Sequence, residues 1–91
     1  MIMLHRYWFT FPRSSFTELP QGILIGCGIT AYSQEDAINI LQTTLFKSAV
    51  MPEFETITQD VDISTLDGSH ILPNMGDITS RGIWFPLGYP L

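Results

Sequence analysis

Lysine and arginine are scarce in this chain. Its 91 residues include four basic and nine acidic side chains, for a formal net charge of −5 at pH 7. A surface with this balance repels phosphate backbones, so we expect no binding to nucleic acid. The same balance favours a basic protein partner, or it serves only to keep the protein in solution.

Cysteine and long apolar runs are also scarce. The single cysteine, Cys27, cannot form an internal disulfide or a cysteine-based zinc site, which fits a reducing compartment. Residues 1–6 show no basic region leading into an apolar core, so we expect no secretory signal. The longest apolar run, near residues 22–32, is shorter than the roughly 20 residues that cross a bilayer. We therefore expect a cytoplasmic protein that does not bind membranes.

The familiar motifs of catalysis are missing too. The chain has no Gly-x-Ser-x-Gly turn and no glycine-rich loop followed by lysine, and His5 and His70 have no paired spacing. Cys27 lies between two glycines, but its parity in a strand places it on an apolar face, where a thiol is inert. These observations favour a protein that is not an enzyme, with no catalytic residue and no cofactor.

What the chain does have is apolar sequence with clear periodicity. With 45% hydrophobic and 14% charged residues, it has the composition of one compact domain over residues 1–91. Residues 22–32 alternate so strictly that we expect a long strand with one buried face. Ser33 then begins a helix, which Asp36 helps to cap and which ends near Lys47.

Three further strands are expected around this centre. Residues 5–11 alternate, with Tyr7, Phe9 and Phe11 on one face and Trp8 on the other. Residues 54–63 predict a third strand whose core face carries Ile57, Val61 and Ile63, and a single helical turn follows over residues 64–67. Residues 82–86 predict a short strand, which Pro86 restricts to an edge of the sheet.

This order of elements predicts an α+β fold. The simplest packing of these elements is a two-layer sandwich, in which one main helix covers a largely antiparallel or mixed sheet of three to four strands. If the third strand pairs in parallel with the second, the helical crossover between them should be right-handed.

Gly26 and Gly28 share the less apolar face of the second strand. Glycine inside a strand indicates that another group approaches the backbone closely. Trp8, on the neighbouring strand, is the expected cover for this bare backbone, and a ligand or partner approaching the same place is the alternative.

The richest polar stretch runs from Asp60 to His70. Asp60 and Asp62 share one face of the predicted third strand, where their oxygens would suit Mg²⁺ or Ca²⁺, and Asp67 and His70 could fold back towards them. The spacing does not match an EF-hand loop. A solvated strand face followed by a capping serine and a turn aspartate explains the same residues without a metal.

The segment from His70 to Phe85 mixes apolar and polar side chains without periodicity. It is either a strap that buries apolar side chains against one end of the sheet or a surface that binds a partner, and the two are compatible. Tryptophan is favoured at protein contacts. The candidate partner-binding residues are Trp8, Asn74, Asp77, Arg81, Trp84 and Phe85.

Two resemblances can be stated. Residues 26–37 run from Gly26 and Cys27 through Ser33 into an acidic helix start, and with one extra residue they resemble the strand-to-helix junction of HicB-type antitoxins. The chain departs from those proteins in having no recognisable DNA-binding addition, and its acidic balance does not suit an operator binder. Residues 64–67, 70–76 and 81–86 resemble a family of small bacterial proteins of unknown function, which implies no activity.

The function expected from these observations is that of a small interaction module. It would bind another protein, or a second copy of itself, through its acidic face or its aromatic C-terminal edge. An antitoxin or immunity protein that neutralises a basic toxin is the sharpest version. The alternative is a small metal-binding domain or metal-dependent enzyme that uses Asp60, Asp62, Asp67 and His70.

Overall fold

The fold is that of a computed structural model, which describes residues 3–12, 26–44, 46, 53–66, 68, 71, 73 and 75–86. The elements are β1 (His5–Thr10), β2 (Cys27–Ala31), α1 (Gln34–Thr44), β3 (Thr56–Gln59), the 3-10 turn η2 (Ile63–Thr65) and β4 (Gly82–Phe85). The strands form one four-stranded sheet in the order β3-β1-β2-β4, and every neighbouring pair is antiparallel. The predicted α+β class and the antiparallel sheet are confirmed.

The two central strands carry the alternation that the sequence predicts. In β1, Tyr7 and Phe9 point to one face and Trp8 to the other, and all three side chains are buried. In β2, which ends at Ala31, every residue is buried. Residues 22–25 of the predicted long strand lie outside the described residues. A strand that is buried on both faces needs cover on both sides of the sheet.

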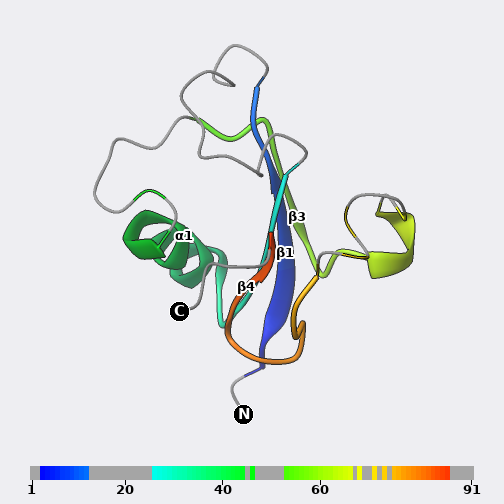
Figure 1. Cartoon of the computed structure of the whole chain (residues 1–91). Helices are drawn as coiled ribbons and strands as arrows, with labels where there is room; N and C mark the ends of the chain where they lie inside the picture. Colours follow the sequence, from blue (N-terminus) through cyan, green and yellow to red (C-terminus); the bar gives the residue numbers. More distant parts are fainter. Residues whose placement is uncertain are drawn as a thin grey trace.

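The helix covers one face of the sheet (Figure 1). Ser33 starts α1 as predicted, because its hydroxyl oxygen accepts the Asp36 N–H at 3.1 Å and its carbonyl accepts the Ala37 N–H. Ala37, Ile40 and Leu41 are the buried residues of the helix. The cluster on this face is formed by Tyr7, Phe9, Phe11, Cys27, Ile29, Ala31, Ala37, Ile40, Leu41 and Phe46.

The opposite face has a second apolar cluster, supplied by β4 and by the chain between β3 and β4. Trp8 and Trp84 lie at its centre with their rings stacked and their centroids 5.8 Å apart. Figure 1 shows η2 on the side of the sheet opposite α1. The remaining buried members are Val61, Ile71 and Phe85, and Ile63, Leu66, Met75 and Ile78 pack against them. The segment predicted to be a strap, from His70 to Phe85, therefore covers this face of the sheet. Leu72, which belongs to that segment, lies outside the described residues.

The third strand is shorter than predicted, and its face assignment was partly wrong. Strand β3 stops at Gln59 because Asp60 adopts a positive φ of 54° and turns the chain. Ile57 packs on the helix side as expected, but Val61 and Ile63 pack in the opposite cluster. A period of two holds only while the backbone stays extended, so the turn at Asp60 resets the alternation.

The helical turn after β3 also differs from its prediction. It spans Ile63–Thr65, and its N-cap is Asp62, whose carboxylate oxygen accepts the Ser64 N–H at 3.0 Å and the Ser64 hydroxyl at 2.7 Å. Aspartate and serine are both good caps, so residue type alone did not separate them.

The two strand glycines are covered by the protein's own tryptophans, but not by one alone. A Cβ on Gly26 would lie 2.5 Å from a ring atom of Trp8, and its φ of 147° also favours glycine. A Cβ on Gly28 would instead overlap three ring atoms of Trp84. Trp8 was the predicted cover for both positions, and Trp84 of the other neighbouring strand takes the second.

No helix within the described ranges combines the length and the apolar character that would be needed to span a membrane.

Candidate functional site

The outer edge of β3 is one of the two edges of the sheet, and its residues are accessible. Strand β3 pairs only with β1 among the described strands. Thr56, Thr58 and Gln59 are exposed, and only Ile57 is partly buried. We call Thr56–Gln59, with the neighbouring Glu55 and Asp60, the open edge.

The direction of the backbone groups on this edge follows from two hydrogen bonds at its ends. Glu55 donates its N–H to the carbonyl of Thr10 at 2.8 Å, and Val61 donates to the carbonyl of Arg6 at 3.2 Å. Both bonds point towards β1. Because backbone groups alternate along a strand, Trp8, which lies between these two acceptors in β1, also faces β3, and its register partner Thr58 faces β1. The N–H and C=O groups of Ile57 and Gln59 therefore point away from β1. An edge of this kind is a template for one more strand.

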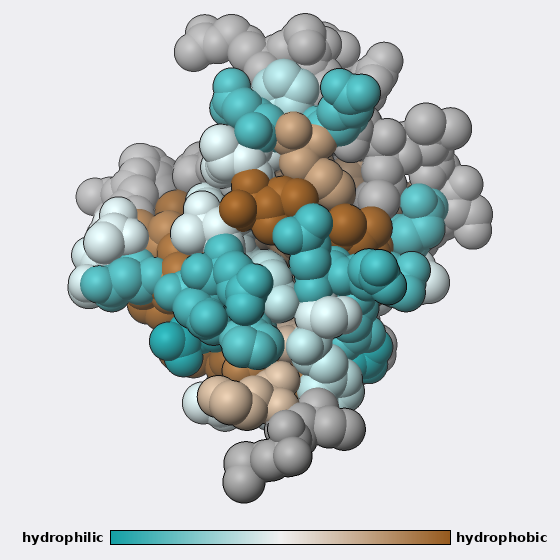
Figure 2. All heavy atoms as spheres, turned by 180° about the vertical axis from the view of Figure 1, so that it is seen from behind, coloured by the Kyte–Doolittle hydropathy of each residue, from teal (hydrophilic) through white to brown (hydrophobic). Residues whose placement is uncertain are grey.

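Acidic side chains flank the open edge on both ends. Glu53 and Glu55 precede strand β3, Asp60 and Asp62 follow it, and all four side chains are exposed. The Asp62 carboxylate accepts hydrogen bonds from the Ser64 hydroxyl, which has the larger effect, and from the Ser64 N–H, and both lower the pKa of Asp62. In Figure 2, hydrophilic side chains cover much of the face seen from behind, and apolar ones show in a smaller patch near the middle. The open edge therefore combines unpaired backbone with negative charge.

The other edge of the sheet, β4, is closed by the chain itself. Gly76 donates its N–H to the carbonyl of Trp84 at 2.7 Å, and β4 shifts register against β2 between Gly28 and Ile29. Pro86 follows the strand directly and cannot donate a backbone hydrogen bond. The predicted edge position of this strand is confirmed. Among the described residues, those of β3 are mostly exposed, whereas those of β4 are mostly buried.

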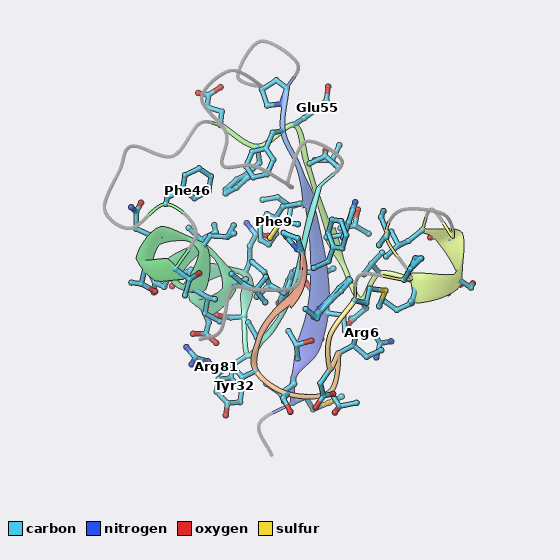
Figure 3. The ribbon with its side chains drawn as sticks, in the orientation of Figure 1. Arg6, Phe9, Tyr32, Phe46, Glu55 and Arg81 are labelled. Carbon is cyan, nitrogen blue, oxygen red and sulfur yellow. The ribbon has the colours of Figure 1, made fainter. Side chains whose placement is uncertain are left out.

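A second polar surface lies where α1 begins. Arg81 donates from Nε to Asp36 Oδ2 at 2.8 Å and from Nη2 to Asp36 Oδ1 at 2.5 Å. The guanidinium also lies 5.9 Å from the ring centroid of Tyr32, a side chain that is 50% exposed. Figure 3 shows Tyr32 and Arg81 side by side, with Glu55 near the opposite end of the molecule. We call Tyr32, Asp36 and Arg81 the arginine corner.

The arginine corner shifts the pKa values of its own groups. The hydrogen bonds from Arg81 are the main cause that lowers the pKa of Asp36, and the Tyr32 N–H adds to it. The same carboxylate raises the pKa of Arg81. Both groups are therefore ionised and already paired, so the corner is a structural clamp with one exposed aromatic ring beside it.

Of the predicted partner-binding residues, the tryptophans and Phe85 are buried. Trp84 is fully buried, and Trp8 and Phe85 are nearly so. A partner does not reach their rings in this structure. Asp77 and Arg81 are accessible, but Asp77 accepts hydrogen bonds from Thr79 and Ser80, which lower its pKa. Asn74 lies outside the described residues.

The predicted metal ligands do not form a group of three or more within the described ranges. Asp60 accepts a hydrogen bond from His5, with Nδ1 and Oδ1 2.9 Å apart, and Asp62 caps η2. The turn at Asp60 separates the two carboxylates from the shared strand face that the sequence predicted. Asp67 and His70 lie outside the described residues. The metal site stays a prediction.

Tyr32 was not among the predicted site residues, and Asp36 was predicted only to cap the helix. Pairing of Asp36 with Arg81 joins residues 45 positions apart, and a long-range ion pair has no local sequence signal. The open edge had a partial signal, because a solvated strand face was one of the two explanations of Asp60 and Asp62. What the sequence did not reveal is that β3 stands at the edge of the sheet.

Comparisons with protein-family models, with curated proteins and with solved structures give no match. The resemblance of residues 26–37 to HicB-type antitoxins, and that of the later segments to small bacterial proteins, therefore stay predictions.

Proposed function

We propose that this protein is a non-enzymatic interaction module of the cytoplasm that binds a basic protein partner. The observation that carries the proposal is the open edge of β3, where exposed backbone is flanked by Glu53, Glu55, Asp60 and Asp62. Complementary charge steers partners together and selects among them.

The overall charge supports the same partner class. A net charge of −5 on 91 residues attracts basic surfaces and opposes contact with nucleic acid. The placement in the cytoplasm is supported by the single, buried Cys27. An antitoxin or immunity protein that neutralises a basic toxin is the sharpest form of the proposal.

The test is affinity capture from a bacterial lysate, followed by purification of each captured protein and measurement of direct binding. We expect a basic protein that binds one to one and whose affinity falls as the salt concentration rises, because exposed charges are screened. Size-exclusion chromatography with mass determination gives the oligomeric state. A strict monomer that captures no basic protein would contradict the proposal.

A further inference from the structure

The sheet protects one of its edges and leaves the other open. Strand β4 is closed by the Gly76 hydrogen bond, a register shift and Pro86. Strand β3 has none of these devices over its four residues: its register with β1 is regular, and it contains no proline, lysine or arginine. Threonine and isoleucine, three of its four residues, favour the extended conformation that a neighbouring strand requires.

From this contrast we infer that the open edge of β3 takes an extended basic segment of the partner protein as a fifth strand. The inference rests on the proposed function and assigns its contact surface. The backbone groups of Ile57 and Gln59 would hydrogen-bond to the incoming segment, and Glu55 and Asp60 would meet lysine or arginine side chains at its two ends. Strand addition of this kind derives its affinity from main-chain hydrogen bonds and its selectivity from side chains.

Charge decides against a second copy of this chain as the fifth strand. Each copy would place Glu53, Glu55, Asp60 and Asp62 beside the same four carboxylates of its neighbour. Among the described residues, Arg6 and His5, which hydrogen-bonds Asp60, are the basic side chains next to this edge. In a parallel pair each acid would lie beside its own counterpart. In an antiparallel pair the acidic residues at one end of β3 would lie within about 10 Å of those at the other end of the neighbouring strand. This is the distance beyond which salt screens the repulsion between charges. Like charges across strands are destabilising, and a basic segment removes that cost.

The direct test uses a blocked six-residue peptide with the order lysine, valine, threonine, valine, threonine, lysine. Two-dimensional NMR follows the backbone amides of the wild-type protein during titration at low salt. We expect the largest shifts, and the largest gain in protection from hydrogen exchange, at the amides of Ile57 and Gln59. The same peptide with glutamate in place of lysine should cause no shifts. Shifts centred on Tyr32 and Arg81 would overturn the inference.

Two matched charge reversals locate the electrostatic part. Glu55→Lys and Glu35→Lys change the net charge equally, and both residues are exposed, but Glu35 lies in the first turn of α1. We expect Glu55→Lys to weaken peptide binding by about fivefold and Glu35→Lys to leave it nearly unchanged. Equal effects of the two changes would mean that only overall charge matters, and the edge would be excluded.

Gln59→Pro tests the backbone part, because proline at this exposed position removes an N–H that points away from β1. We expect binding to fall by about tenfold or more, while circular dichroism stays that of the wild type. Should the variant unfold, the Ile57 and Gln59 amides of the wild type still decide the question. A folded variant that binds the peptide normally would overturn the inference.

The same variant separates this inference from the proposed function. If a basic partner is captured equally by the wild type and by Gln59→Pro, the assignment of the edge is overturned but the proposed function stands. Absence of any basic partner overturns the function itself. A wild-type dimer that Gln59→Pro converts to a monomer would show that a second copy occupies the edge, which also overturns the inference.

Discussion

Arg81 holds Asp36 through two hydrogen bonds, and this pair joins the start of β4 to the start of α1. The contact crosses 45 positions of sequence. Nearby, the Thr30 hydroxyl donates to the carbonyl of Ile78 at 2.6 Å and ties the same segment to β2. The chain that covers the second sheet face is therefore fastened to both the helix and the sheet.

Replacing Asp36 with asparagine should destabilise the protein at neutral pH, because it removes the charge that Arg81 binds. The pair is partly exposed, so solvent weakens it and we expect a fall of a few degrees in the thermal midpoint. Glu35→Gln is the control, since it removes a charge from the same turn without touching Arg81. A midpoint equal to that of the control would show that the pair contributes nothing.

The pH dependence of this pair has a defined sign. Arg81 lowers the pKa of Asp36 in the folded protein. The stabilisation is therefore fully present above the pKa of the unfolded chain, which is about 4, and it is lost as the pH falls through the pKa of the folded protein. Thermal melts between neutral and acid pH should show the wild type and Asp36→Asn converging in acid. A difference that stays constant over that range would contradict this assignment.

Gly28→Ala should destabilise the protein by about 3 kcal/mol, because the new methyl group would overlap the buried six-membered ring of Trp84. Phenylalanine at position 84 lacks that outer ring, so Trp84→Phe should recover part of the loss in the double variant. Trp8→Phe is the matched control and should recover none. Urea unfolding of the single and double variants measures the coupling, and recovery by Trp8→Phe would contradict the packing.

Cys27 should resist thiol reagents in the folded protein. Its side chain is fully buried, and burial raises the pKa of the thiol, so neither access nor thiolate is available. Modification by a chromogenic disulfide reagent should be complete within the mixing time in denaturant and slow in native buffer. Rapid reaction of the native protein would show that β2 opens readily.

Divalent cations should leave the thermal midpoint unchanged. The two described carboxylates of the predicted metal site already accept hydrogen bonds. Asp60 accepts one from His5, and Asp62 accepts one from Ser64. Melts with Mg²⁺, Mn²⁺, Ca²⁺ or Zn²⁺ and with a chelator give the comparison. Because a ligand of the native state raises the midpoint, a clear rise with one metal would support the metal-binding alternative instead.

Much of the fold could be read from local patterns. Alternation identified β1 and β2 and their faces, and Ser33 identified the start of α1, since both signals depend only on neighbours in sequence. The same reasoning failed at Asp60, where a single positive φ moved Val61 to the other face. The covers of Gly26 and Gly28 were half right, because strand order decides which tryptophan lies over which glycine.

By itself, the sequence determined the acidic charge, the apolar strand that carries Cys27, and the capped helix that follows it, because each depends on composition or on residues close together in the chain. Only the tertiary structure decided that β3 is an accessible edge while β4 is closed, and that Trp84 is core. Those outcomes depend on which strands become neighbours. Long-range pairing minimises the free energy of the whole chain, so no single segment encodes it.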